Sequence, residues 1–337
     1  MQDRTDADVA AWKREGVVRA LNGVGLDPLV EETRTVPQSD RRRVKLGYQR
    51  TKKTSVLGFY AAGSHAVIPV PECKIARPEI LAAMPALADL VRLGAPRKRA
   101  LAVTVTVCEA GLDVSVTEGK ELDLPLREAL GQAAGAMGLA RLVWNDEPVA
   151  QAQPPVQRFG TAWVVPPPGA FLQASANGEA LLRDFILDAV GESKTVVDLF
   201  AGCGAFSLPL AERCTVTAIE GEAAMIAALD AGWRQTEGLR TVTGITRDLF
   251  RRPLLPDELN KFDAIVFDPP RAGAKAQAAE IARSTVPVVV GASCMPGSFA
   301  RDAALLAAGG YTLEKVMPVD QFRWSTHVEM AGIFRKQ

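Results

Sequence analysis

The chain has 337 residues, of which 48% are apolar and 23% are charged. At about 100–200 residues per domain, this length predicts two domains. Basic and acidic residues number 39 each, which excludes a generic polyanion binder that acts through its overall charge. No apolar run reaches the ~18 residues of a membrane span, so no membrane partner is expected. The first twenty residues lack the apolar middle of a signal peptide, and a cytoplasmic location is therefore predicted.

The five cysteines and two histidines argue against a metal site and against a disulfide framework. The cysteines are odd in number and widely spaced, and no CxxC pair occurs among them. The histidines, His65 and His327, are too few for a multi-histidine site. We expect free thiols and no bound metal.

The first part of the chain is predicted to be a smaller α+β domain. Helical spacing of apolar residues predicts a helix over 7–22, which Gly23 and Gly25 end. Alternating apolar pieces predict strands within 43–71 and a β-hairpin over 100–117. A helix is expected around 125–138, and prolines at 166–168 close the region. The N-terminal domain is therefore placed at 1–165, with its first helix a candidate to pack on the following domain.

A basic run, DRRRVKLGYQRTKKTS, extends from Asp40 to Ser55. Such a run is often just a solvated face. Alternatively, it contacts phosphates as part of an RNA-binding surface.

Residues 166–337 follow a different pattern. Helical segments separate short apolar runs, which are TVVDLF, TVTAIE, AIVFDP and VPVVVGAS. This alternation indicates a mostly parallel sheet with crossover helices. The predicted fold class is α/β, with a Rossmann-like C-terminal domain at 166–337.

A glycine-rich turn follows the first of these strands. The strand ends in Asp198–Leu199–Phe200, and Gly202 and Gly204 then lead into a helical segment. A turn of this kind lets a ligand approach the backbone closely. Its spacing matches neither a dinucleotide fingerprint nor a phosphate-binding loop.

Acidic residues end two further strands. Glu220 is placed either to accept hydrogen bonds from both hydroxyls of a ribose or to cap the next helix. Asp268 precedes Pro269 and Pro270, which fix its direction at the edge where such sheets bind ligands. Together with the glycine turn, these acids favour S-adenosylmethionine over NAD as the cofactor.

Cys294 follows the strand VPVVVGAS and is expected to face the same edge. A lone cysteine is more often a small buried hydrophobe. Beside a methyl donor, however, a thiolate can add to C6 of uracil and make C5 nucleophilic, and a base must later remove the C5 proton. Glu329, in the strand-like HVEMAGIF, is the candidate base and His327 competes with it, although both suit an exposed edge strand as well.

These motifs, in this order, resemble the RNA uracil-5-methyltransferases. The likeness is closest to the bacterial 23S rRNA (uracil-5-)-methyltransferases, and the tRNA enzyme is a further relative. The matching stretches are Phe171–Gln173, DLFAGCGAFSLPLA from Asp198, Ile219–Glu220, DPPRAG from Asp268, SCMPGSFARD from Ser293 and HVE from His327. Weaker likeness at 10–21 and 58–73 extends the resemblance over nearly the whole chain.

The resemblance implies a class I methyltransferase domain acting on RNA, with rRNA the first expectation and tRNA the second, and no obligate protein partner. Cys294 would be the nucleophile and Glu329 the base, while Arg301 and Asp302 would start the helix after the cysteine loop. The residues implied around S-adenosylmethionine are Gln173, Phe200, Gly202, Gly204, Glu220, Asp248 and Asp268.

The chain also departs from the family pattern. Met295 replaces the usual Asn after the nucleophile, and no separate β-barrel module is expected ahead of the first helix. Many rRNA enzymes of the family hold an iron–sulfur cluster on four cysteines, of which Cys73 alone has a counterpart here, so no cluster is expected.

Two other functions stay open. An amino-methyltransferase would favour an aromatic residue where Arg271 stands, and it would leave Cys294 without a role. A non-catalytic RNA-binding paralogue is the other alternative.

Overall fold

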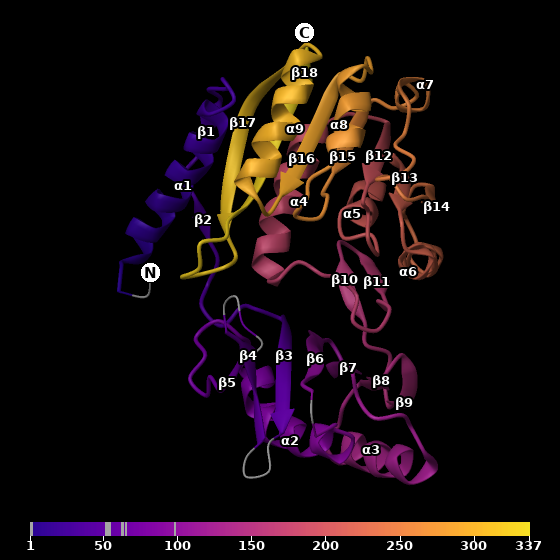
Figure 1. Ribbon diagram of the computed structural model, residues 1–337. Coiled ribbons are helices and arrows are strands. Elements are labelled where there is room, and N and C mark those ends of the chain that lie inside the picture. The colour runs from indigo at the N-terminus through magenta and orange to yellow at the C-terminus, as the bar shows by residue number, and fades with distance from the viewer. Residues whose placement is uncertain (1–2, 51–54, 62–63, 65, 98) are drawn as a thin grey trace. The chain divides into compact units, whose positions relative to one another are not determined.

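The computed structural model describes residues 3–50, 55–61, 64, 66–97 and 99–337. The chain forms two compact units (Figure 1). The first unit comprises Met1–Val36, Arg158–Val164 and Asn177–Gln337, and the second comprises Pro37–Gln157 and Val165–Ala176. The division differs from the expected boundary near 165, because the first 36 residues group with the C-terminal part of the chain.

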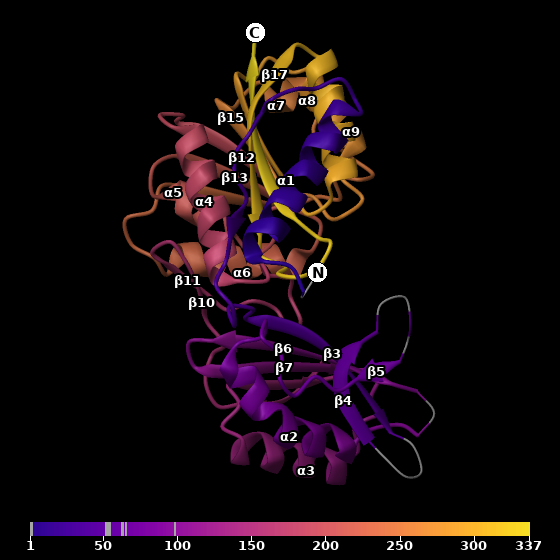
Figure 2. The ribbon, with the colours of Figure 1, turned by 90° about the vertical axis from the view of Figure 1, so that its left-hand side faces the viewer.

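The second unit is an α+β layer structure. Its sheet has the order β5-β4-β3-β6-β7-β8-β9, and only β7 and β8 pair in parallel among these described strands. Helices α2 and α3 lie side by side against the sheet (Figure 2). The elements are β3 (Arg43–Arg50), β4 (Ser55–Tyr60), β5 (Val67–Ile68), α2 (Pro78–Leu93), β6 (Leu101–Cys108), β7 (Gly111–Thr117), α3 (Leu124–Ala136), β8 (Arg141–Trp144) and β9 (Glu147–Gln151).

The basic run of this unit is only partly a solvated strip. Arg42 is buried, and its Nε donates to the carbonyl of Gln173 at 3.3 Å. Arg43 donates from Nη2 to the carbonyl of Gly169 at 2.9 Å. These two arginines therefore hold the segment 169–173, while Lys45 and Arg50 are exposed. Lys52 and Lys53 lie outside the described residues.

The first unit is built on a large mixed sheet. The strand order is β1-β17-β18-β16-β15-β12-β13-β14, and β2 also pairs with β17. The strands from β16 to β14 in this order are mutually parallel, whereas β18 runs antiparallel to both β16 and β17. The strands are β1 (Leu29–Val30), β2 (Arg34–Thr35), β12 (Thr195–Leu199), β13 (Thr215–Glu220), β14 (Val242–Thr246), β15 (Ala264–Phe267), β16 (Val288–Ser293), β17 (Tyr311–Asp320) and β18 (Glu329–Lys336).

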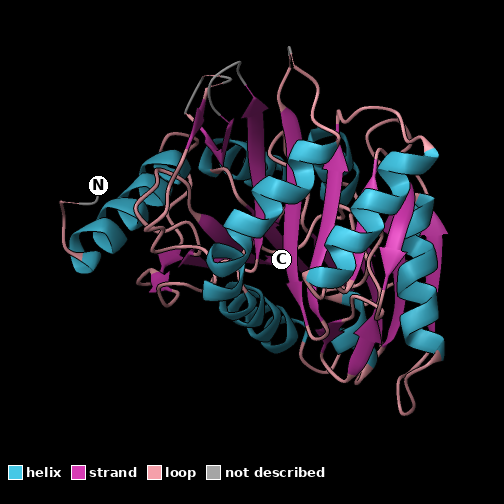
Figure 3. Ribbon diagram, turned by 90° about the horizontal axis from the view of Figure 1, so that it is seen from below, coloured by secondary structure: helices cyan, strands magenta, loops and turns pink. Residues whose placement is uncertain are grey.

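Helices pack against these strands (Figure 3). They are α1 (Asp6–Asn22), α4 (Ala176–Val190), α5 (Ser207–Ala211), α6 (Ala223–Arg234), α7 (Pro256–Leu259), α8 (Lys275–Ala282) and α9 (Pro296–Ala308). A short hairpin of β10 (Gln157–Phe159) and β11 (Ala162–Val164) completes the unit. Helix α1 begins with a capping box between Thr5 and Asp8, and its Val17 and Leu21 join the apolar core.

The fold predicted from the sequence is confirmed. The expected helix over 7–22, the hairpin over 100–117 and the parallel strands of the C-terminal part are all present. Among the described residues, no helix combines the length and apolar character that crossing a membrane requires.

Candidate active site

Cys294 and Glu329 are brought together by strand pairing. Cys294 directly follows Ser293, the last residue of β16, and Ser293 pairs with Met330 of β18. Because these strands are antiparallel, the next residue of β16 comes beside the preceding residue of β18, which is Glu329. Sequence positions 35 residues apart thus meet at one edge of the sheet, as the predicted roles of nucleophile and base require.

Charges on three neighbouring side chains act on Cys294, which is half-buried. Burial raises the pKa of the thiol, and the negative charges of Glu329 and Asp268 raise it further. Arg271 opposes this effect and lowers the pKa of the thiol through its positive charge. The site therefore holds the thiol mainly protonated, with one cation in place to stabilise a thiolate.

Glu329 is 3% exposed. Burial raises its pKa well above the ordinary value, and the charge of Asp268 adds to the effect. Gln321 donates from Nε2 to Oε2 of Glu329 at 2.9 Å, and this hydrogen bond together with the charge of Arg271 lowers the pKa again. A buried carboxyl with a raised pKa can hold a proton taken from a substrate.

Sequence reasoning missed that Gln321 contacts Glu329 and that the charge of Arg271 acts on both Cys294 and Glu329. Gln321 follows β17 and lies eight residues before Glu329 across the turn into β18. A polar amide so close to a buried acid in a predicted strand pair was the available signal. Arg271 was noted only as a residue that is not aromatic.

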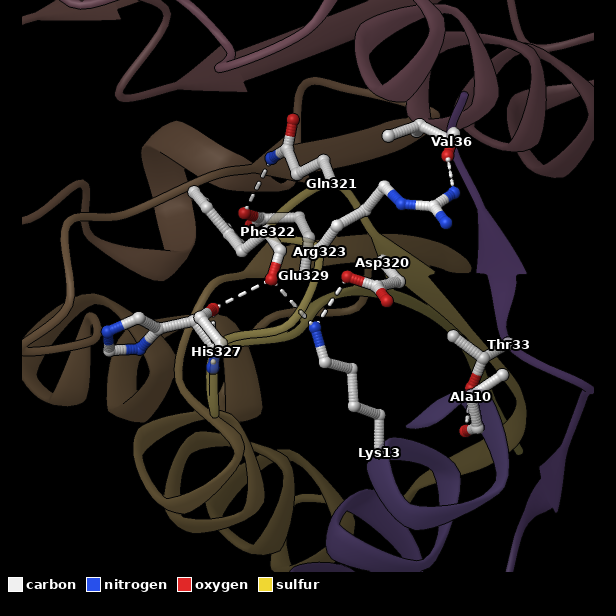
Figure 4. Close-up of polar contacts among 11 residues, drawn as sticks. Ala10, Lys13, Thr33, Val36, Asp320, Gln321, Phe322, Arg323, His327 and Glu329 are labelled. Carbon is white, nitrogen blue, oxygen red and sulfur yellow. Dashed lines mark hydrogen bonds and ion pairs between the residues drawn. The ribbon is translucent and has the colours of Figure 1, made fainter. Parts of the chain in front are cut away.

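The competing base, His327, is half-buried in the turn before β18. Its ring packs edge-on against Phe322, with ring centroids 6.0 Å apart. In Figure 4 its imidazole points away from the Glu329 carboxylate. This orientation favours Glu329 as the base.

The glycine turn after β12 has the backbone conformation that its sequence predicts. Gly202 and Gly204 have φ of 56° and 98°, and Phe200 has φ of 63°. The N–H of Gly202 donates to Oε2 of Glu220, and that of Glu222 donates to Oε1, each at 3.0 Å. A carboxylate accepts about four hydrogen bonds, so Glu220 keeps lone pairs for a ribose while it also fixes the turn.

An apolar groove lies beside this turn. Oδ1 of Asp248 accepts the N–H of Phe250 at 2.9 Å and so shapes a tight turn. Phe250 is 52% exposed, and its ring centroid is 5.4 Å from that of Phe200. The groove has a volume of about 480 Å³ and is lined by Phe250, Ala272, Gly273, Lys275, Ala276, Ala279 and Leu305. Its size and apolar walls suit a flat organic ring, and sequence reasoning did not single out Phe250.

Two acids connect the turn with the catalytic pair. Asp268 follows β15, and its charge raises the pKa values of Cys294, Glu329 and Asp198. Asp198 is 1% exposed and accepts a 2.6 Å hydrogen bond from Oγ of Ser207. Burial, followed by the charges of Asp268 and Glu220, raises the pKa of Asp198 to about 7. Asp268 therefore faces both halves of the site.

Arg301 and Asp302 do not start helix α9, as the resemblance implied, because this helix already begins at Pro296. Oδ2 of Asp302 accepts the N–H of Ala274 at 2.6 Å, and Nη2 of Arg301 donates to the carbonyl of Ala272 at 2.9 Å. Both side chains thus fasten the loop that carries Arg271.

Gln173 is the one predicted site residue outside the first unit. It is 4% exposed and lies in the segment that Arg42 and Arg43 hold. The other predicted residues all belong to the first unit. Within the described residues, no group of three or more His, Cys, Asp or Glu side chains could hold a metal ion.

No family model matches the chain. The chain is 44% identical over 325 residues to a protein of Mesorhizobium japonicum described as an uncharacterized RNA methyltransferase, covering 96% of this chain and 78% of that protein. A Brucella suis protein with the same description is 41% identical over 336 residues, covering 100% and 81% of the two chains. The 23S rRNA (uracil(1939)-C(5))-methyltransferase RlmD of Chromohalobacter salexigens is 33% identical over 316 residues, covering 86% and 63%.

A solved structure has a similar fold. It is the tRNA (uracil-54, C5)-methyltransferase of Pyrococcus abyssi in complex with S-adenosyl-L-homocysteine, with a TM-score of 0.73 and 18% identity, covering 98% of this chain and 83% of that chain. This similarity confirms the Rossmann-like methyltransferase fold. From the sequence relationships, the chain belongs to the RNA methyltransferases.

Proposed function

We propose that the chain transfers a methyl group from S-adenosylmethionine to C5 of a uridine in RNA, with Cys294 as nucleophile and Glu329 as base. The observation that supports this most is the register of β16 and β18, which sets the two residues side by side. A cysteine and a buried carboxyl at that edge supply the nucleophile and the base that this reaction needs.

The residues beside the glycine turn fit S-adenosylmethionine. Glu220 would hold the ribose hydroxyls, the open face of the turn at Gly202 would take the amino-acid part, and the groove at Phe250 would take the adenine. Asp248 and Asp268 would border the cofactor, and Phe200 would support Phe250. When bound, S-adenosylmethionine supplies the electrophilic methyl group.

The first task of the protein is to make C5 nucleophilic. The thiolate of Cys294 adds to C6 of the uracil ring, a C6–S bond forms, and the ring electrons move onto C5 and O4 as an enolate. Arg271 beside the sulfur stabilises the thiolate before the addition.

The second task is to restore the aromatic ring once C5 carries the methyl group. The carboxylate of Glu329 takes the C5 proton, the electrons of the C5–H bond form the C5–C6 double bond, and the C6–S bond breaks to return the Cys294 thiolate. The proton stays on Glu329, whose buried environment favours the neutral acid.

For the RNA partner, we propose 23S rRNA first and tRNA second. The 33% identity to RlmD supports the rRNA assignment. The fold shared with the tRNA enzyme gives weaker support for tRNA, because a shared fold does not identify the substrate. The second unit would contribute RNA contacts, with the exposed Lys45 and Arg50 as candidates.

RNA that contains 5-fluorouridine tests the mechanism. Fluorine at C5 cannot leave as a proton, so the adduct with Cys294 should persist through denaturation, and Cys294→Ala should form none. Absence of this complex from a preparation that methylates RNA would overturn the mechanism. Methylation by Cys294→Ala would favour the amino-methyltransferase instead. Cofactor binding without methyl transfer to any cellular RNA would favour the non-catalytic paralogue.

Mass mapping of 5-methyluridine identifies the target. Ribosomal and transfer RNA from cells with and without this protein should differ at one uridine. We expect the missing methyl group in 23S rRNA, and its loss from tRNA instead would select the tRNA alternative.

A further inference from the structure

The turn that joins β17 to β18 carries Gln321, the hydrogen-bond donor to Glu329. Residues of the first 36 hold this turn from the far side through buried polar groups (Figure 4). The base is therefore connected to helix α1, more than 300 positions away in sequence, by way of one amide side chain.

Lys13 of α1 is the centre of this connection. Its side chain is 0% exposed, and Nζ donates to Oδ1 of Asp320 at 2.5 Å and to the carbonyl of Phe322 at 3.0 Å. Asp320 and Phe322 flank Gln321. The ammonium group thus binds the residue before and the residue after the one that contacts Glu329, which leaves the backbone of Gln321 little freedom.

Arg323 braces the same turn one residue later. Its Nη1 donates to the carbonyl of Val36 at 2.7 Å, and its Nη2 forms an ion pair with Asp6 at 2.5 Å. The guanidinium also lies over the ring of Trp324, whose φ of 57° is in the left-handed region. Two cations therefore hold a strained turn.

Anchoring of α1 does not require a buried charge. Val9, Val17 and Leu21 of the same helix are each at most 2% exposed and already pack it on the unit. A buried ion pair is seldom more stabilising than apolar side chains of the same volume, because both charges lose their water. The placement of Lys13 around Gln321 calls for a role beyond stability.

We propose that Lys13, through Asp320 and the carbonyl of Phe322, is a positioning residue that fixes Gln321 and thereby the carboxylate of Glu329 for removal of the C5 proton. The inference rests on the proposed function. Lys13 acts mainly on the second half of the reaction, because its contacts are with the turn before β18 and its own charge is not among those that act on Cys294.

Two RNA substrates separate the two halves of the reaction. An adduct with 5-fluorouridine RNA reports addition by Cys294, since the C5 fluorine blocks the later step. With ordinary uridine RNA, the denaturation-resistant adduct accumulates only when proton removal is slow. In Lys13→Met we expect the adduct with 5-fluorouridine RNA to form as in the wild type. The adduct with ordinary uridine RNA should accumulate, and release of the methylated product should slow at least roughly tenfold.

Further variants control for misfolding and for a general weakening of the packing of helix α1. Lys13→Met/Asp320→Asn removes both charges, so that no charge is left buried alone, and it should give the same pattern. Gln321→Met removes the hydrogen bond to Glu329 directly, and the adduct with ordinary uridine RNA should accumulate in this variant as well. Val17→Ala opens a cavity under α1 without touching the turn, and it should leave the ratio of the two adducts at the wild-type value.

The outcomes are distinct. If the wild type forms no adduct with 5-fluorouridine RNA, the proposed function fails. If the wild type forms it but Gln321→Met releases product normally, or if Val17→Ala accumulates adduct as Lys13→Met does, the positioning role is overturned. Accumulation in the Lys13 and Gln321 variants alone supports it.

Discussion

The proposed cofactor edge and the proposed catalytic edge of the first unit lie on the same sheet and are built differently. The cofactor edge, formed by the turn 200–204 with Glu220, relies on backbone N–H groups and positive φ angles. The second edge, formed by Cys294, Gln321 and Glu329, relies on two ionisable side chains, those of Cys294 and Glu329, whose pKa values are raised by burial.

The difference matches the task proposed for each edge. A cofactor that is not altered by the protein before it binds needs a rigid binding surface. Backbone N–H groups in a fixed turn supply one without reorganisation of side chains. Proton removal needs a group whose two protonation states are both accessible, and burial of a carboxyl beside another acid provides this. Each prediction below concerns one edge, and the first and the last also measure whether the other edge responds.

Glu329→Gln should have the largest effect. The amide keeps the shape of the side chain but cannot accept the C5 proton, so kcat should fall by about 10²–10⁴. Ordinary uridine RNA should then accumulate as a covalent adduct, while the affinity for S-adenosylmethionine should stay unchanged. A variant that turns over at the wild-type rate would show that the base lies elsewhere.

The pH dependence is the next largest effect. Both Cys294 and Glu329 must lose a proton, and burial raises both pKa values, so the single-turnover rate should keep rising from pH 6 to above pH 9. Arg271→Met removes a cation that lowers both pKa values and should shift the profile to higher pH. A plateau already reached below pH 7 would contradict the burial of these groups.

The raised pKa of Glu329 also makes the stability of the fold depend on pH. The folded state binds the proton of Glu329 more tightly than the unfolded state, whose pKa is about 4.3. This stabilisation is complete below the unfolded pKa and is lost as the pH rises through the raised folded pKa. Denaturant titrations should show a free energy of unfolding that falls over this range, with a smaller fall in Glu329→Gln.

The two edges also differ in how far the sequence predicts them. Glycines and strand-ending acids leave local patterns, so the turn at Gly202 and Gly204 and the acid Glu220 were predicted from spacing, whereas the role of Phe200 was implied by the resemblance. Lys13 acts on residues more than 300 positions away and has no local signature, whereas the contact of Gln321 with Glu329 becomes evident only once β17 and β18 are paired. A lysine at helical spacing in α1 looks like a solvated residue, and only its 1% exposure reveals otherwise.

The basic run shows the reverse error, in which a local pattern predicts too much. A string of arginines predicts a charged surface, yet Arg42 is buried and hydrogen-bonded to the backbone near Gln173. Charge patterning reports composition along the chain, whereas strand pairing decides which of the alternating side chains point inward.

Alkylation of Cys294 should respond to the charges around it. Removal of the negative charge in Glu329→Gln should lower the pKa of the thiol and speed the reaction with iodoacetamide at pH 8, whereas Arg271→Met should slow it. One pKa unit corresponds to about tenfold in the thiolate fraction. Mass spectrometry of the peptide that contains Cys294 measures the rate, and the buried Cys203 in the same digest serves as control. Equal rates in the three proteins would mean that these charges do not reach the sulfur.

The smallest effects should come from paired substitutions at the cofactor edge. Gly204 has φ of 98°, and an added Cβ would lie 3.0 Å from Leu229 and 3.1 Å from Leu208, so Gly204→Ala should destabilise the fold by about 1–3 kcal/mol. Gly202 has φ of 56° and open space where its Cβ would lie, so Gly202→Ala should cost only about 1 kcal/mol, or roughly 2–4 °C in Tm. Its methyl group, however, would project into the space proposed for the cofactor.

Calorimetry of unfolding and of S-adenosylmethionine binding should therefore distinguish the two variants, with stability lost mainly in Gly204→Ala and affinity lost mainly in Gly202→Ala. Equal affinities in both variants would place the cofactor away from this turn, while adduct formation by Cys294 with 5-fluorouridine RNA should remain, because the catalytic edge is built from other strands.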